Sequence, residues 1–414
     1  MAVTNKLTQK LALAAGALLG HSAAQAASNS DESGLYNSWN VDVGYLRYTE
    51  PDKITVDTYM AQINGNLSDK DTIKLGLVFD TLTGSTPTGA LPDTDYVTVS
   101  GVSGGGGFSA GSAGGMAPFD DTRLAIDTSW GHEWQRLIRS KFSAYVSVEG
   151  DYTAVGGGIA LEKDTEDKAY TFTAAIGGSV DKVSRSNEQT PAPLSQTDDN
   201  VFYGAGTKNT YDLLLGMSKV INRRTAAMLN FSYSRSLGYH TDPYKMISVA
   251  DIDDAEFTTL YESRPEERER YILYSKIVHE LPSSGHHLSA SYRYYTDTWD
   301  LNSHTFEGHY SFNLNAKHLL APFARLYHQE AANFYQRTIL SDDGVLDNLP
   351  EFASSDPRLG EMLSLTVGSK YQYKTSETGS IDLRVGYIHR QYTDAVIEDD
   401  NTVFVTLDLG KGFD

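Results

Sequence analysis

The chain has 414 residues, with 34 Lys and Arg against 54 Asp and Glu, a formal net charge of −20 and no cysteine. The lack of cysteine excludes a disulfide scaffold, thiolate metal ligands and a cysteine nucleophile. The acidity argues against a nucleic-acid partner, because a phosphate backbone binds a basic surface. Charged residues make up only 21% of the chain and aromatic residues 11%, so the composition is that of a folded protein.

The first residues have the features of a secretory signal peptide. Two lysines precede the apolar stretch Leu11–Gly20, and Ala24-Gln25-Ala26 forms an A-x-A cleavage site. The apolar stretch is too short to cross about 30 Å of hydrocarbon as a helix. We therefore expect residues 1–26 to be removed and residues 27–414 to be exported.

The rest of the chain is dominated by a sequence period of two. Residues 363–373 place leucine, valine and tyrosine at alternate positions, and serine, threonine, glycine, lysine and glutamine between them. Successive side chains of a β-strand point to opposite faces, so this pattern predicts a strand with one apolar and one polar face. The alternating segments are about ten residues long, which is typical of membrane barrels, whereas strands of soluble sandwiches are nearer five or six.

Counting these segments gives about sixteen strands. They are residues 38–48, 54–66, 72–82, 122–131, 139–150, 153–163, 169–181, 208–221, 225–237, 268–281, 287–297, 303–314, 319–335, 361–375, 379–392 and 400–412. Every second connection is short and polar, whereas long ones occur at 83–120, 182–207, 238–267 and 336–360. Short periplasmic turns and long external loops are typical of an even-stranded outer-membrane barrel. The sequence thus predicts an all-β fold, a single-domain transmembrane antiparallel β-barrel with both termini in the periplasm of a Gram-negative bacterium.

Several motifs of the later half follow one another in order. They are Arg264-Pro265 with Arg268 and Arg270, Tyr292–Trp299 with Ser303-His304-Thr305, Pro322 and Arg325 leading to Gln329, Ala332, Phe334 and Tyr335, and Ala353–Leu359. In these motifs the chain resembles an uncharacterised bacterial outer-membrane family, domain of unknown function 3570, most densely over residues 264–375. The resemblance implies location and architecture, and it implies no activity and no functional residue.

No catalytic motif is complete. His132-Glu133 and His279-Glu280 begin like zincin helices but lack the second histidine, and no G-x-S-x-G occurs. We therefore expect no enzyme, no cofactor and no dedicated metal site. Loop 238–267 carries eight acidic residues against two basic ones. Such oxygen ligands suit Ca²⁺ or Mg²⁺, but we interpret the loop as a solvated external segment, or as one bridged to lipopolysaccharide through divalent ions.

If the apolar positions of each strand face lipid, the alternate positions face the lumen, and many of these carry charged residues. The candidates are Asp42, Lys74, Asp80, Arg123, Asp127, Glu149, Asp181, Asp212, Arg293, Glu307, His309, Lys370, Lys374, Asp382, Arg384 and Asp408. Charges facing hydrocarbon would be costly, at about 2–4 kcal/mol for a midplane Arg or Lys, so these must meet water or each other.

The sequence favours a porin-like passive channel for small solutes, with a polar lumen that mildly favours cations because carboxylates predominate. The alternative is a barrel that serves as a scaffold or sleeve for an exported partner assembly, such as a redox or secretion assembly. Membrane lipid and lipopolysaccharide are the expected surroundings, and an unidentified protein partner belongs to the second interpretation.

Overall fold

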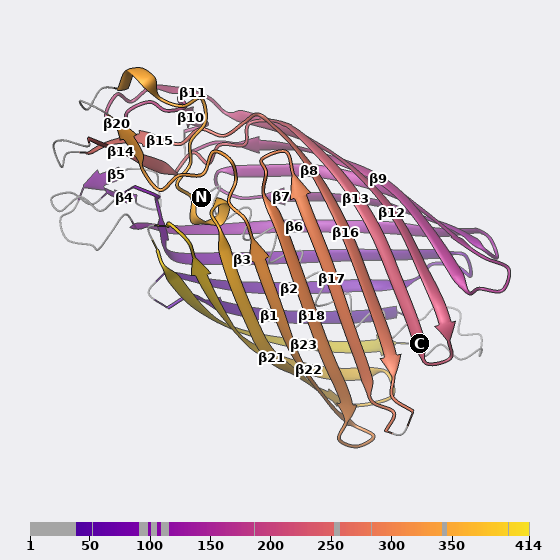
Figure 1. Ribbon diagram of the computed structural model, residues 1–414. Coiled ribbons are helices and arrows are strands. Elements are labelled where there is room, and N and C mark those ends of the chain that lie inside the picture. The colour runs from indigo at the N-terminus through magenta and orange to yellow at the C-terminus, as the bar shows by residue number, and fades with distance from the viewer. Residues whose placement is uncertain are drawn as a thin grey trace.

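The computed structural model describes residues 39–413 apart from 52, 91–97, 101–105, 109–115, 186, 252–256, 283, 342–345 and 396. The predicted signal peptide lies outside the described residues. Sixteen antiparallel strands form one closed barrel, and several short strands gather at one of its ends (Figure 1). No helix of the described residues is long and apolar enough to cross a membrane.

Each barrel strand pairs with its neighbours in chain order. In that order they are β1 (Trp39–Thr49), β2 (Ile54–Asn66), β3 (Asp71–Pro87), β6 (Met116–Gln135), β7 (Ile138–Val148), β8 (Tyr152–Asp164), β9 (Tyr170–Val183), β12 (Gly206–Asn222), β13 (Thr225–Gly238), β16 (Glu267–Glu280), β17 (His287–Asp297), β18 (Asn302–Asn313), β19 (His318–Gln329), β21 (Met362–Lys374), β22 (Gly379–Tyr392) and β23 (Asp399–Phe413). The wall closes where β1 pairs with β23, from Trp39 opposite Phe413 to Thr49 opposite Val403.

The remaining elements are short and belong to the connections. They are β4 (Thr98–Ser100), β5 (Gly106–Phe108), β10 (Gln189–Pro191), β11 (Phe202–Gly204), β14 (Met246–Asp251), β15 (Phe257–Tyr261), β20 (Ile339–Ser341), and the 3₁₀ turns η1 (Leu346–Asn348) and η2 (Pro357–Leu359). All of these lie in the long connections, which leave the barrel at the end opposite Trp39 and Phe413. We call this the loop end, and the other the turn end.

The predicted fold is confirmed, and each of the sixteen predicted segments corresponds to a barrel strand. The boundaries differ in two places. Strands β3 and β6 pair further toward the loop end than expected, as far as Pro87 opposite Met116. The strand predicted at 319–335 ends at Gln329, so the prediction is wrong for residues 330–335. Ala332 and Phe334 are buried in a hydrophobic core formed by the loops and do not belong to the barrel wall.

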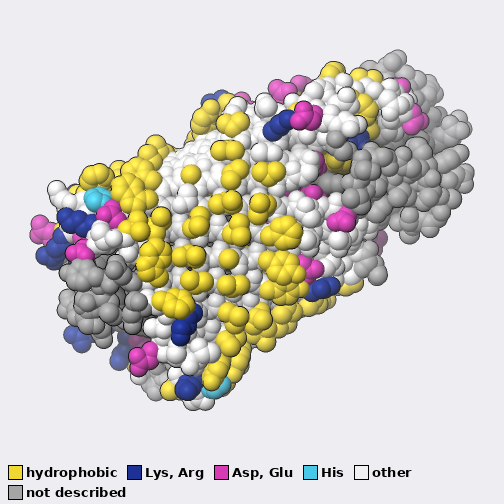
Figure 2. Space-filling view, turned by 180° about the vertical axis from the view of Figure 1, so that it is seen from behind, with side chains coloured by type: hydrophobic (Ala, Val, Ile, Leu, Met, Phe, Trp, Pro, Cys, Tyr) yellow, Lys and Arg dark blue, Asp and Glu magenta, His cyan; other side chains and the backbone are white. Residues whose placement is uncertain are grey.

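Burial on the barrel is the reverse of that in a soluble protein. Leu363, Leu365 and Val367 on β21 are 44–47% exposed, whereas Ser364 and Thr366 between them are buried. Hydrophobic side chains cover the middle of the visible face, and charged side chains gather toward its two ends (Figure 2). So many exposed hydrophobic side chains on one face would be an aggregation liability in water, and on a closed membrane barrel they form the surface that contacts lipid.

The two faces of β21 predict opposite responses to a charge. Leu365→Arg places a charge on the lipid side, at a cost of about 2–4 kcal/mol near the midplane. Gln372→Arg places it on the inner face, next to Asp382 on β22. We expect the first variant to fold poorly and the second to assemble, as measured by heat-modifiable migration of the outer-membrane fraction on gels. Equal assembly of both variants would contradict the assigned phase.

Candidate pore lining and loop cap

The charged residues predicted for the lumen lie on the strand face opposite the exposed hydrophobic side chains. Fifteen of the sixteen occupy this face of a barrel strand, and Glu149 lies in the turn between β7 and β8. Further bases share this inner face, among them Lys208 on β12, Arg270 and Lys276 on β16, and Arg325 on β19. They are absent from the predicted set, although the phase set by Tyr271 and Leu273 would have found those on β16.

Many of the inner charges are paired across neighbouring strands. Lys370 Nζ lies 3.0 Å from Asp382 Oδ2, Lys208 Nζ lies 3.0 Å from Asp181 Oδ2, and Lys74 Nζ lies 3.8 Å from Asp127 Oδ2. Arg123 donates to Asp80, and within β18 His309 Nε2 lies 2.6 Å from Glu307 Oε1. Apart from Lys208, all of these residues belong to the predicted lumen set, so part of the predicted charge excess is neutralised within the wall.

Glycines on adjacent strands make room for inner carboxylates. A Cβ at Gly44 would lie 2.6 Å from Asp408 Oδ1, and a Cβ at Gly410 would lie 2.8 Å from Asp42 Oδ1. Each glycine is the direct register partner of the aspartate that covers it. A side chain at these positions would meet the carboxylate, so glycine lets the aspartate lie against the wall rather than project across the lumen.

Aromatic rings lie over glycines in the same way. A Cβ at Gly386 would lie 2.2 Å from the Phe404 ring, and a Cβ at Gly368 would lie 2.6 Å from the Phe323 ring. The Arg384 guanidinium is 5.5 Å from the centroid of the Phe323 ring, a cation–π distance. Phe323 and Phe404 therefore lie flat against the inner face of β19 to β23, and Arg384 lies beside the Phe323 ring.

Part of the inner face is apolar, which the prediction of a uniformly polar lumen did not include. Leu46 on β1, Val56 and Met60 on β2 and Leu82 on β3 are buried on the inner face, and Phe404 packs against them. Near the loop end of β2 the apolar residues Ile54 and Val56 fall in the inward phase and the polar Thr55 in the outward phase, and this reversed alternation is the sequence signal of the patch.

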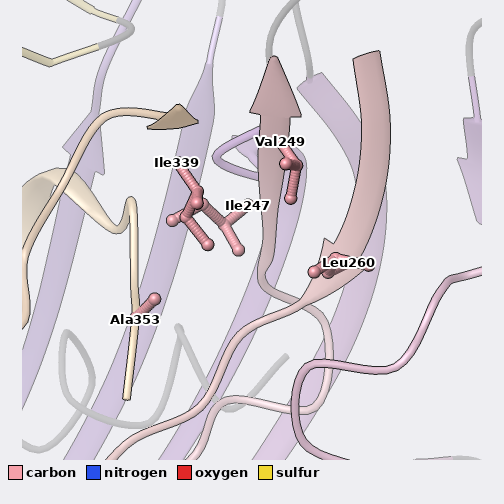
Figure 3. Packing of buried hydrophobic residues seen from close by; sticks show 5 residues of the cluster. All are labelled: Ile247, Val249, Leu260, Ile339 and Ala353. Atoms are coloured by element: carbon pink, nitrogen blue, oxygen red, sulfur yellow. The ribbon is translucent and has the colours of Figure 1, made fainter. Parts of the chain in front are cut away.

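The long connections fold into a cap on the loop end. Strand β14 pairs antiparallel with β15 and parallel with β20, which joins loop 239–266 to loop 330–361. A hydrophobic core holds this sheet together. It consists of Ile247, Val249, Leu260, Ile339 and Ala353 (Figure 3). The hydroxyl of Ser355 donates to the backbone oxygens of Gly89 and Met246, each at 2.8 Å, so the connection after β3 is attached as well.

A buried network of charges lies within the cap. Its acids and bases are equal in number: Asp242, Glu262 and Asp356 against Lys245, Arg264 and Arg358. Arg264 bridges two of the acids, with Nε 2.6 Å from Glu262 Oε1 and Nη2 2.9 Å from Asp356 Oδ2. The second Glu262 oxygen accepts from Ser354 Oγ, and the first accepts from the Asp242 amide at 2.7 Å. Removing one partner of such a buried pair leaves an uncompensated charge, which is strongly destabilising.

Burial and pairing act in opposite directions on these groups. Burial raises the pKa of Glu262 and lowers that of Lys245. Burial alone would raise the pKa of Asp356 too, but Arg358, Lys245 and Arg264 hold it well below its usual range. Burial likewise opposes the charge on Arg264, whose pKa nonetheless rises because Glu262 and Asp356 are adjacent. The network is therefore held together by its guanidinium groups.

The interpretation of loop 238–267 as a solvated segment is wrong for Asp242 and Glu262. Both are buried, because the bases that pair with them come from within the loop and from loop 330–361. Asp253, Asp254 and Glu256 of the same loop lie outside the described residues. Paired bases thus replace water or divalent ions as partners of these two acids.

The motifs of the family resemblance meet at the cap and the rim below it. Arg268 pairs with Asp297 and lies 4.0 Å from the Trp299 ring centroid, and Trp299 Nε1 donates to the Glu267 backbone oxygen at 2.9 Å. Gln329 Nε2 donates to the backbone oxygens of Arg358 and Gly360, each at 2.8 Å. The motifs thus build a structural joint between barrel and cap.

A closed antiparallel barrel satisfies every strand within its own wall, and here its outer surface is apolar and its inner face charged, as in membrane barrels. The protein is a transmembrane antiparallel β-barrel. It belongs to the family described as Protein of unknown function (DUF3570), whose pattern matches residues 8–410. No curated protein matches the sequence.

Several solved outer-membrane barrels are similar to this chain at very low sequence identity and with TM-scores below 0.5. A bacterial polysaccharide outer membrane secretin is 10% identical, with a TM-score of 0.45 and coverage of 91% of this chain and 98% of that one. OccK3 (OpdO) of Pseudomonas aeruginosa is 7% identical, with a TM-score of 0.42 and coverage of 91% and 95%. The ferric enterobactin receptor PfeA of Pseudomonas aeruginosa is 10% identical, with a TM-score of 0.43 and coverage of 87% and 54%, so this chain spans about half its length.

The charge network predicts that the cap depends on Arg264. Arg264→Ala leaves Glu262 and Asp356 buried without their shared cation, which costs about 3–5 kcal/mol. We expect loop 330–361 to become sensitive to protease while the strands stay resistant. Lys182→Ala, which removes an exposed pair with Glu188 near the same end, is the matched control and should leave the loop resistant. Resistance in both variants would show that the network does not hold the cap.

Proposed function

We propose that this barrel is a porin-like passive channel for small charged solutes. The observation that carries the proposal is the arrangement of inner side chains over glycines, which keeps Asp42, Asp408, Phe323 and Phe404 against the wall. A sixteen-stranded wall is wide enough for an aqueous lumen if its side chains do not cross it. Solutes would then move down their gradient, past the cap at one end and the charged inner face along the barrel.

The charge of the inner face supports a mild preference for cations. Asp42, Asp382 and Asp408 interact with one another on β1, β22 and β23 and form an acid-rich sector. Arg270, Lys276 and Arg325 oppose it from β16 and β19, so the preference is weaker than the carboxylate excess alone would give. Mixed sectors of this kind create a field across a pore, which orders the passage of polar solutes.

The same proposal implies which surfaces of the barrel contact the membrane and whether the protein needs a catalytic group. The apolar outer surface would contact membrane lipid, and the loop end would face lipopolysaccharide. Transport by diffusion requires no catalytic group, so we assign no enzymatic role.

Reconstitution in a planar bilayer tests the channel. Under a salt gradient we expect steady conductance and a reversal potential of cation-selective sign. The preference should decline with salt, because the Debye length falls from about 10 Å at 0.1 M to about 3 Å at 1 M. Anion selectivity would contradict the charge argument. A silent bilayer with correctly folded protein would contradict the channel and favour the alternative, a scaffold or sleeve for an exported partner assembly.

Because inner side chains lie flat over glycines, a glycine-to-alanine substitution beneath one of them should change the conductance of the channel. Gly386→Ala places a Cβ 2.2 Å from the Phe404 ring, so the ring must leave the wall and enter the lumen. We expect a lower, but not abolished, single-channel conductance. Gly308→Ala is the control, since the nearest atom to its Cβ is the Ser289 oxygen at 4.0 Å. Equal conductance of the two variants would show that the ring does not border the path.

A further inference from the structure

Three carboxylates meet at the loop-end rim, apart from the cap network. Asp121 lies on β6, and Glu149 and Asp151 belong to the turn between β7 and β8. Their exposed fractions are 8%, 8% and 4%. One ligand oxygen from each lies within 4.8 Å of the others. The pairing of β6 with β7, which reaches Leu124 opposite Val148, brings position 121 beside the turn.

Several of these buried oxygens lack a hydrogen-bond donor among the described residues. Both oxygens of Asp151, Oδ2 of Asp121 and Oε1 of Glu149 are without one. Arg123 Nε is 4.0 Å from Glu149, beyond hydrogen-bond distance, and the same guanidinium already pairs with Asp80. Among the described residues, three neighbouring acids thus face the guanidinium of Arg123, which is shared with a fourth acid. Buried anionic groups without donors are costly unless a cation joins them.

The protonation behaviour of the turn is consistent with this shortage of positive charge. Burial raises the pKa of Glu149 to about 8 and that of Asp151 to about 7. Neighbouring carboxylates act in the same direction as burial, whereas Arg123 opposes it at Glu149. Burial thus opposes the charged form of both carboxylates.

We propose that Asp121, Glu149 and Asp151 form a binding site for a divalent cation, Ca²⁺ by their oxygen-only ligand set. Ca²⁺ takes oxygen ligands at about 2.5 Å, so ligands on opposite sides of the ion are about 5 Å apart, and three oxygens within 4.8 Å of one another can share one ion. Mg²⁺ binds at about 2.1 Å in strict octahedral geometry, with opposite ligands about 4 Å apart, and retains several waters. Three carboxylates offer oxygen ligands only, in the flexible arrangement that Ca²⁺ accepts.

The position of the site gives the ion a structural role at the rim. It would join β6 to the turn between β7 and β8, directly before Tyr152. Tyr152 and Ala154 pack with Val183, and Tyr239 of the cap loop packs on this cluster. The bound ion therefore fixes the part of the rim on which the cap loop rests, and Ca²⁺ outside the cell would tighten that joint.

The test uses the full mature barrel, folded in detergent and dialysed against a chelator. The thermal midpoint of the folded form is measured while Ca²⁺ is added, and bound Ca²⁺ is counted after dialysis. We expect one ion per chain, a midpoint that rises with Ca²⁺ concentration, and no comparable rise with Na⁺ at equal ionic strength. Asp151→Asn and Glu149→Gln should each weaken binding at least tenfold, whereas Asp120→Asn, at the exposed neighbouring position, should bind normally.

The change in stability that Asp151→Asn causes in the absence of Ca²⁺ distinguishes a cation-binding site from a purely structural role of this carboxylate. Without Ca²⁺, Asp151→Asn should be at least as stable as the wild type, since it removes one of the crowded negative charges. With Ca²⁺, the wild type should be the more stable of the two. Absence of bound Ca²⁺ in the wild type, or equal binding by Asp151→Asn and Glu149→Gln, would overturn the proposal. Each readout is independent of conductance, so the site and the channel can fail separately.

Discussion

Satisfaction of the backbone hydrogen bonds within a membrane is the constraint on which the structure depends. Hydrocarbon offers no partner for an N–H or C=O group, so each strand must pair on both edges and the last must return to the first. The pairing of β23 with β1 along the full length of β1 meets this condition. Closure then separates two environments, and the period of two in the sequence assigns alternate side chains to each.

The inner face shows how charge and bulk are accommodated once the wall is closed. Where an aspartate or a phenylalanine points inward, a glycine on the next strand receives it, as at Gly44 under Asp408 and Gly386 under Phe404. At the loop end the long connections extend beyond the barrel wall, so other interactions must order them. There a small hydrophobic core and a charge-balanced network around Arg264 order the two longest described loops.

The sequence predicts the features that follow from a local repeat, and it does not predict contacts between residues that are far apart along the chain. Alternation and loop length determine the strands and the inward phase, because both follow from the local period and from the membrane thickness. The pairing of Arg264 with Asp356 joins residues 92 positions apart, and no local pattern indicates it. The error at 319–335 has the same cause, since burial of Ala332 and Phe334 in a loop core imitates a strand. The inner apolar patch around Leu46 was missed because apolar residues were assigned to lipid by phase alone.

The central claim is a barrel with lipid outside and water inside, and alternate-position labelling of β13 tests it most directly. The chain has no cysteine, so single substitutions give unambiguous labels. Ser232→Cys and Ser234→Cys lie on the inner face, whereas Phe231→Cys and Tyr233→Cys lie on the outer face. In membranes, the account predicts that a water-soluble thiol reagent modifies the serine positions and that only a lipid-soluble reagent modifies the aromatic ones. Modification of all four by the water-soluble reagent, or of none, would contradict the account.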